Sequence, residues 1–249
     1  MTGGSGFAER DTRIFSGSRQ IGPEFFMLNS QDWPTRTGLS GGAAPQVQFG
    51  RFSTFDNQTL HWRSMHTGPG QYVWAELDKV HAALPSTCKI VYCLYGTPAW
   101  LAPDAVIGPY GGVGEAAPPT DLTQVTAFLT ALLARYPGRI EAVQVWNEPD
   151  YLSNGGGFWR GTREQLVALI AAASGVLRAA GVTVLSPGCT LLENPNSGAD
   201  QWLQAGGSAH VDAMSLHPYR TTPSRRYPGD GSLASSAQGL RMARKVHPT

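Results

Sequence analysis

The sequence predicts an α/β fold built on a parallel sheet. Short apolar runs alternate along the chain with segments of helical periodicity, and most of these runs are continuously apolar rather than alternating. Parallel strands need crossover connections, usually helices, and strands covered on both faces are continuously apolar. A (β/α)8 barrel and an open doubly wound sheet share this order of elements, so periodicity alone leaves both closures open.

Six short apolar runs are expected to form the strands. They are Glu24–Asn29, Gln46–Phe52, Lys89–Tyr95, Ile140–Trp146, Val182–Ser186 and Val211–Leu216. The segments after the third and fourth runs, residues 100–119 and 147–161, are long and rich in Gly, Pro and Trp. Loops at the carboxyl ends of parallel strands build the active site in both kinds of fold, so we expect function to lie there.

Three segments show strong helical signals, and two show weaker ones. In the first, Val73, Leu77 and Val80 recur at helical spacing. The second follows Asp121, a plausible N-cap, and the third ends before Gly181, a favourable residue after a helix. The strong helices are predicted over Tyr72–Leu84, Leu122–Tyr136 and Thr162–Ala180, and the weaker ones over residues 200–206 and 233–245.

Composition favours an ordinary globular protein. The 249 residues fit one large domain, and we expect a single domain over residues 1–249 in which residues 1–20 are irregular. Hydrophobic residues make up 41% and charged residues 15%, which argues against disorder, and a net charge of +1 argues against binding to nucleic acid. Leu166–Leu177, the longest apolar stretch, is too short to span a bilayer. The oligomeric state stays open.

No cofactor or metal ion is expected. The three cysteines form no C-x-x-C pair, and His61 and His66 lie outside an H-E-x-x-H motif. Gly112–Ala117 matches the dinucleotide pattern G-x-G-x-x-A, but Pro118 follows where a helix would have to begin. Met1–Arg10 shows no charged segment followed by an apolar one, so no signal peptide is visible and the cellular location stays open.

The strongest local signal for function is the segment Trp146-Asn147-Glu148-Pro149. A predicted buried strand ends here, and proline stops it because proline cannot donate to the strand ladder. A carboxyl group partly buried beside an aromatic ring has its pKa raised toward neutrality, which suits general acid–base catalysis. The alternative for a lone Glu is a loop or helix-capping acid; the strand, the amide and the proline together favour catalysis.

This segment resembles the acid/base motif of the retaining glycoside hydrolases of clan A, which are (β/α)8 barrels. Three further segments resemble these enzymes in the same order: Gly70–Asp78, Tyr95–Trp100 and Val211–Tyr219. Together they are most similar to family 39, the β-xylosidases and related bacterial exopolysaccharide endoglycosidases. The resemblance spans roughly residues 20–220 and implies a TIM-barrel type α/β fold with about six βα units in this chain.

The resemblance implies a role for each matching residue. Glu148 would be the catalytic acid/base, and Asn147 would hold the 2-hydroxyl of the sugar. Arg51, at the end of the second predicted strand, would lie beneath the nucleophile. His217 and Tyr219 would line the site, with Tyr219 as a hydrogen-bond partner of the nucleophile. The implied partner is a carbohydrate substrate, and the implied chemistry needs no cofactor.

The tryptophans favour a sugar site on separate grounds. Four of them fall at or just after predicted strand ends: Trp33, Trp100, Trp146 and Trp159. Aromatic rings stack on the apolar faces of sugars, although core packing is the alternative for any single ring. We expect Trp100 and Trp146 to contact the substrate.

The resemblance also implies a second glutamate, the nucleophile, at the end of a seventh strand. Retaining hydrolysis needs both carboxylates, about 5 Å apart, and that strand would begin after residue 249. We therefore expect a C-terminally truncated barrel, in which Asp32, Glu193 and Asp212 are structural or substrate contacts. Two alternatives stay open: an inactive or vestigial barrel that binds carbohydrate without hydrolysis, and an unrelated barrel or open-sheet enzyme.

Overall fold

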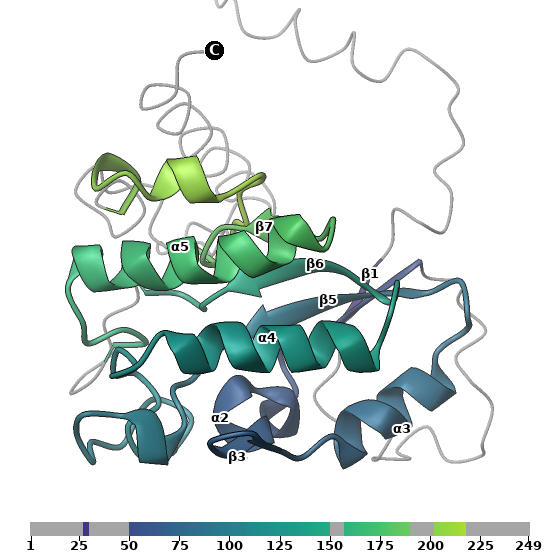
Figure 1. Ribbon diagram of the computed structural model, residues 1–249, viewed down its shortest axis with the longest axis horizontal. Helices are drawn as coiled ribbons and strands as arrows, with labels where there is room; N and C mark the ends of the chain where they lie inside the picture. The colour runs from purple at the N-terminus through teal and green to yellow at the C-terminus, as the bar shows by residue number, and fades with distance from the viewer. Residues whose placement is uncertain (1–26, 30–49, 150–156, 190–201, 218–249) are drawn as a thin grey trace, which may run out of the picture.

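The computed structural model describes residues 27–29, 50–149, 157–189 and 202–217 (Figure 1). Among them, five strands form a parallel sheet whose spatial order, β1-β2-β5-β6-β7, is also their order along the chain. A doubly wound sheet reverses its strand order, so the described strands have barrel connectivity. The strands are β1 (Met27–Asn29), β2 (Arg51–Ser53), β5 (Lys89–Leu94), β6 (Ile140–Val145) and β7 (Thr183–Leu185).

The sixth predicted strand lies beside β7 without forming a regular ladder. It is joined to the preceding segment by two isolated parallel bridges, Leu185–Ala213 and Cys189–Leu216. Between the bridges, the backbone N–H of Ser215 donates to the Ser186 hydroxyl at 2.8 Å. A side-chain oxygen thus takes the place of a backbone carbonyl, which interrupts the strand pattern expected over residues 211–216.

Two long helices, α4 (Thr123–Arg135) and α5 (Arg163–Ala179), lie side by side in front of β5 and β6 (Figure 1). Local signals set their ends. Asp121 accepts a first-turn N–H of α4 at 2.8 Å, and a capping box between Thr162 and Gln165 opens α5. Beyond α5, Gly181 adopts a φ of 70°, as its position after the helix predicts. Both predicted helices are confirmed within one or two residues at each end.

The first predicted helix begins later than its apolar spacing indicates. It is α3 (Ala75–Ala83), and Tyr72 belongs instead to an antiparallel hairpin that turns at Gly70, whose φ is 67°. Val73 lies between hairpin and helix and is 49% exposed, so it does not share the buried face of α3. The shorter elements are η2 (Gln58–Leu60), α2 (Trp62–Met65), β3 (His66–Gly68), β4 (Gln71–Tyr72), η3 (Ala99–Leu101) and η4 (Gly207–His210).

The core lies between the sheet and these helices. In β6, the four consecutive residues Ala142–Val145 are all buried, so both faces of the sheet are covered, as continuous apolar runs predict. Each large apolar side chain removed from water contributes about 1.5–3 kcal/mol to folding. Fully buried residues from the two long helices are Phe128, Leu129, Leu132, Leu169 and Ile170.

Several predictions fall partly or wholly outside the described residues. They concern the irregular segment 1–20 and the helix over residues 233–245; of the helix predicted over 200–206, residues 202–204 are described and are helical. The three cysteines are buried. Within the described ranges, no helix is both long and apolar enough to cross a membrane.

Candidate active site at the carboxyl edge of the sheet

The end of β6 carries the candidate catalytic segment in an uncommon backbone conformation. Trp146 has a φ of 80° and Glu148 a φ of 43°, both in the left-handed region that side chains disfavour. Such conformations cost on the order of 1–3 kcal/mol each and cluster at active sites. Neighbouring backbone holds them here: the Trp146 N–H donates to the Leu94 carbonyl at 2.9 Å, and Asn147 forms a parallel bridge with Gly188.

Glu148 and His217 meet at this edge. Glu148 Oε1 lies 2.7 Å from His217 Nδ1, and the two side chains are only 9% and 16% exposed. The His217 backbone N–H donates to the Cys189 carbonyl at 2.8 Å. The Phe55 ring, just beyond β2, lies edge-on to the imidazole with 5.3 Å between ring centroids. Three segments that are distant in sequence therefore converge on the candidate acid/base.

Asn147 is fully buried, and its side chain is held at one end only. Its Oδ1 accepts a 3.4 Å hydrogen bond from Gln144 Nε2, while the Gln144 Oε1 accepts from the Ser215 hydroxyl at 2.6 Å. Within the described part of the chain, Asn147 Nδ2 has no acceptor. An unsatisfied buried donor costs about 1–3 kcal/mol, so a ligand hydroxyl that reached this atom would recover that free energy.

Asp56 is a carboxyl group at this edge that the sequence analysis missed. Partial burial raises its pKa; the charge of His217 opposes that rise, and the charge of Glu148 adds to it. The predicted strand ended at Phe52, whereas β2 continues to Ser53, and Thr54 donates its N–H to Val91. Extending the strand by two residues would have placed Asp56 at the carboxyl edge.

The structure does not bring Arg51 to this site. Arg51 is the first residue of β2, and it pairs with Glu141 near the start of β6, at 2.5 Å and 2.8 Å. The guanidinium lowers the pKa of the Glu141 carboxyl. Both residues lie at the amino edge of the sheet, opposite Glu148. The predicted strand, Gln46–Phe52, had Arg51 near its end, whereas β2 begins at Arg51.

The two tryptophans expected at the site have different surroundings. Trp146 is fully buried, its Nε1–H donates to the Phe158 carbonyl at 2.8 Å, and its ring packs in the core. Trp100 is 37% exposed, and its Nε1–H donates to the His66 carbonyl at 2.9 Å. Of the two, Trp100 is the one that is partly exposed, and Trp146 is a core residue. Tyr219 lies outside the described residues.

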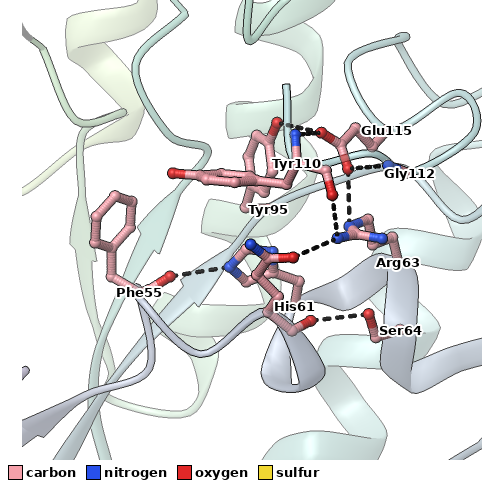
Figure 2. A network of polar contacts seen from close by, with 9 residues as sticks. Phe55, His61, Arg63, Ser64, Tyr95, Tyr110, Gly112 and Glu115 are labelled. Carbon is pink, nitrogen blue, oxygen red and sulfur yellow. Dashed lines mark hydrogen bonds and ion pairs between the residues drawn. The ribbon is translucent and has the colours of Figure 1, made fainter. Parts of the chain in front are cut away.

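A buried carboxylate organises the loop after β5, residues 102–119, beside this edge (Figure 2). The Glu115 side chain is fully buried, lies 3.0 Å from Arg63 Nε, and accepts the backbone N–H groups of Tyr110 at 2.5 Å and Gly112 at 2.9 Å. A Cβ atom at Gly108 or Gly112 would clash with this carboxylate. Gly112, the first glycine of the segment that resembles a nucleotide fingerprint, instead makes room for a buried ion pair.

His61 lies next to this pair, buried against Tyr95 and Tyr110 (Figure 2). Its Nε2 is 2.9 Å from the Phe55 carbonyl, which can only accept, so Nε2 carries the proton. Burial lowers the pKa of His61 to about 4; the hydrogen bond to Phe55 opposes this shift, and the Arg63 charge adds to it. His61 is therefore neutral in the folded protein at neutral pH.

We expect the fold to lose stability between pH 6.5 and 4 because of His61. The unfolded chain protonates this imidazole near 6.5 and the folded one near 4, so the unfolded state binds more protons in that window. Full acidification would lower the free energy of unfolding by about 3 kcal/mol from this group. The free energy of unfolding, measured by urea denaturation across this pH range, should depend less on pH in His61→Gln than in the parent chain. An identical pH dependence in both proteins would contradict the assignment.

The described residues contain no cluster of His, Cys, Asp and Glu that could hold a metal ion.

Several solved structures have a fold similar to that of this chain. Xylanase XynB from Paenibacillus barcinonensis is 14% identical, with 80% of this chain and 60% of the xylanase covered and a TM-score of 0.53. A family 10 endo-β-1,4-xylanase from Gloeophyllum trabeum is 15% identical, with 79% and 60% covered and a TM-score of 0.51. A mutant of xylanase A from P fluorescens subsp. cellulosa, in complex with xylopentaose, is 14% identical, with 81% and 59% covered and a TM-score of 0.53.

The chain has the fold of part of a (β/α)8 barrel, as found in these xylanases. The fold shared with these xylanases agrees with the barrel that the resemblance in the sequence implies. The chain spans about 60% of the length of the xylanases, so the predicted partial TIM-barrel fold is confirmed. No protein-family model matches the sequence, and none of the curated proteins is detectably similar to it.

Proposed function

We propose that this chain contributes Glu148 as the general acid/base of a glycosidase that cleaves a β-linked oligo- or polysaccharide. The observation that supports this most strongly is the 2.7 Å contact between a largely buried Glu148 and His217 at the carboxyl edge of the barrel sheet. Catalytic residues of barrel enzymes lie at this edge. Glu148 would protonate the leaving oxygen and then deprotonate the attacking water.

The His217 contact suits a group that changes its protonation state twice in each cycle. When Glu148 is ionised, Nδ1–H of the imidazole donates to the carboxylate. When Glu148 is protonated, the carboxyl O–H donates to a bare Nδ1. The same pair of atoms therefore keeps the carboxyl group in place in both states, which preserves its position relative to the substrate.

Asn147 and Trp100 would bind the sugar. Asn147 is adjacent to Glu148 and has a buried Nδ2 without an acceptor among the described residues, which suits a hydroxyl next to the reacting carbon. Trp100 follows β5 at the same edge and is partly exposed, as a ring that stacks on a sugar must be. The sequence resemblance implies the role of Asn147, and the placement of the tryptophans at strand ends indicates that of Trp100.

A retaining mechanism further requires a nucleophile about 5 Å from the acid/base. We propose that this is the glutamate that the resemblance places on a seventh strand, after residue 249, and that Asp56 acts as an electrostatic neighbour. The second candidate function is carbohydrate binding without hydrolysis. It is favoured by the Asn147 Nδ2 that has no acceptor among the described residues and by the partly exposed Trp100, which could bind a sugar whether or not hydrolysis follows.

The test is hydrolysis of β-1,4-xylo-oligosaccharides and aryl β-xylosides, chosen because the similar structures are xylanases. If the chain hydrolyses these substrates and the Glu148→Gln variant does not, the result supports the proposed function. Binding of xylopentaose without release of shorter sugars supports the second candidate. Hydrolysis that is unchanged in Glu148→Gln would remove Glu148 from the mechanism.

A further inference from the structure

Gly188 lies directly against the imidazole of His217. If Gly188 carried a Cβ atom, that atom would be 2.6 Å from both Cε1 and Nε2 of His217. Side-chain carbon atoms do not approach other heavy atoms so closely. The ring edge that faces away from Glu148 therefore occupies the space that a side chain at position 188 would fill.

The backbone at Gly188 does not itself require glycine. Its φ is not among the positive values found for seven other glycines of the described chain. The Gly188 N–H donates to the Trp146 carbonyl at 3.3 Å, and the residue bridges to Asn147 in the parallel arrangement of the sheet. Glycine is used here for space rather than for conformational freedom.

We propose that Gly188 is a positioning residue of the candidate active site. Because it has no side chain, the His217 imidazole can lie with its Nδ1 in contact with Glu148. This inference rests on the proposed function. A methyl group at position 188 would push the imidazole away and would separate Nδ1 from the Glu148 carboxylate. It would also approach Gln144 Nε2 at 3.1 Å, a distance that a small side-chain adjustment can relieve.

Other contacts of His217 would not compensate. The Phe55 ring lies edge-on to the imidazole and supplies no hydrogen bond. Asp56 also interacts with His217 through its charge, and this interaction does not fix the orientation of the ring. The backbone bond of His217 to Cys189 anchors the main chain and leaves the side chain free to rotate.

The experiment compares the parent chain with Gly188→Ala, using Gly175→Ala as the matched control. Gly175 lies within α5, and a Cβ there meets nothing within 4 Å. We expect Gly188→Ala to lose the hydrogen-bonded Nδ1 signal of His217 in ¹⁵N NMR spectra and to lower kcat about 100-fold with KM nearly unchanged. Gly175→Ala should preserve both. An unchanged His217 signal in Gly188→Ala would overturn the proposal, whatever the activity.

A double-mutant cycle with His217→Ala shows whether Gly188 acts through the imidazole. Without the ring, the methyl group at position 188 keeps only its 3.1 Å approach to Gln144 Nε2, so Gly188→Ala should add little further loss of kcat or of thermal stability. If Gly188→Ala caused equal losses of kcat and thermal stability with and without the His217 ring, the proposal would be overturned. If no form of the chain hydrolyses a glycoside, as expected when the nucleophile lies after residue 249, the NMR signal and the stability cycle still decide the role of Gly188.

Discussion

Replacing Glu148 by glutamine is expected to lower kcat/KM on a β-glycoside with a poor leaving group by about 10²- to 10⁴-fold, the usual contribution of a general acid. Glutamine keeps the size of the side chain and can still hydrogen-bond to His217 Nδ1. It cannot protonate the glycosidic oxygen. A nitrophenolate departs without protonation, so the bond-breaking step for an aryl glycoside should be affected much less.

The dependence on leaving group is what identifies an acid. Initial rates on a series of aryl β-glycosides of increasing phenol pKa should diverge between the parent chain and Glu148→Gln. Glu76→Gln is a suitable control because Glu76 lies on α3, where it pairs with Lys79 at 2.6 Å and is partly exposed. If Glu148→Gln lowered the initial rate by the same factor across the whole series, Glu148 would have a structural role rather than a role in proton transfer.

Replacing Glu115 by alanine is expected to lower the free energy of unfolding by about 3–5 kcal/mol, the usual result of breaking one side of a buried ion pair. Arg63 would keep its charge in a site where only 18% of its side chain is exposed. The N–H groups of Tyr110 and Gly112 would also lose their acceptor. Urea denaturation of the parent and variant chains measures the difference.

The exposed pair on α3 provides the comparison for Glu115. Glu76→Ala breaks an ion pair whose side chains are 34% and 56% exposed, and we expect it to change the free energy of unfolding by less than about 1 kcal/mol. Equal effects of the two alanine variants would mean that burial adds nothing at Glu115. The predicted difference would show that the loop after β5 is fixed by one buried carboxylate.

The helices were predictable because the signals that end them are local. Asp121, Thr162 and Gly181 act on backbone groups within a few residues, so the sequence contains the whole interaction. Five of the six predicted strands were placed correctly, but their ends were predicted less well than those of the helices, since a ladder depends on partners that are distant in the chain. The β3–β4 hairpin was missed because apolar spacing continued through Tyr72 into α3.

The candidate site was predictable only where a motif named its residues. Glu148, Asn147 and His217 lie together as the resemblance implied, whereas Arg51 was assigned to the wrong edge through a strand boundary. The contribution of Gly188 could not be inferred, since its role depends on the position of a side chain 29 residues later in the chain.

The most direct test of a sugar site at this edge is the response of the Asn147 side-chain amide to an oligosaccharide. Glu148→Gln, labelled with ¹⁵N, would be titrated with xylopentaose, so that binding is measured without turnover. A ligand hydroxyl that bonds to the unsatisfied Nδ2 should shift the Asn147 amide signals in a saturable way. Two results would contradict a carbohydrate site beside Glu148. In the first, the Asn147 signals do not shift at any sugar concentration. In the second, they do not shift while signals from residues at the amino edge of the sheet do.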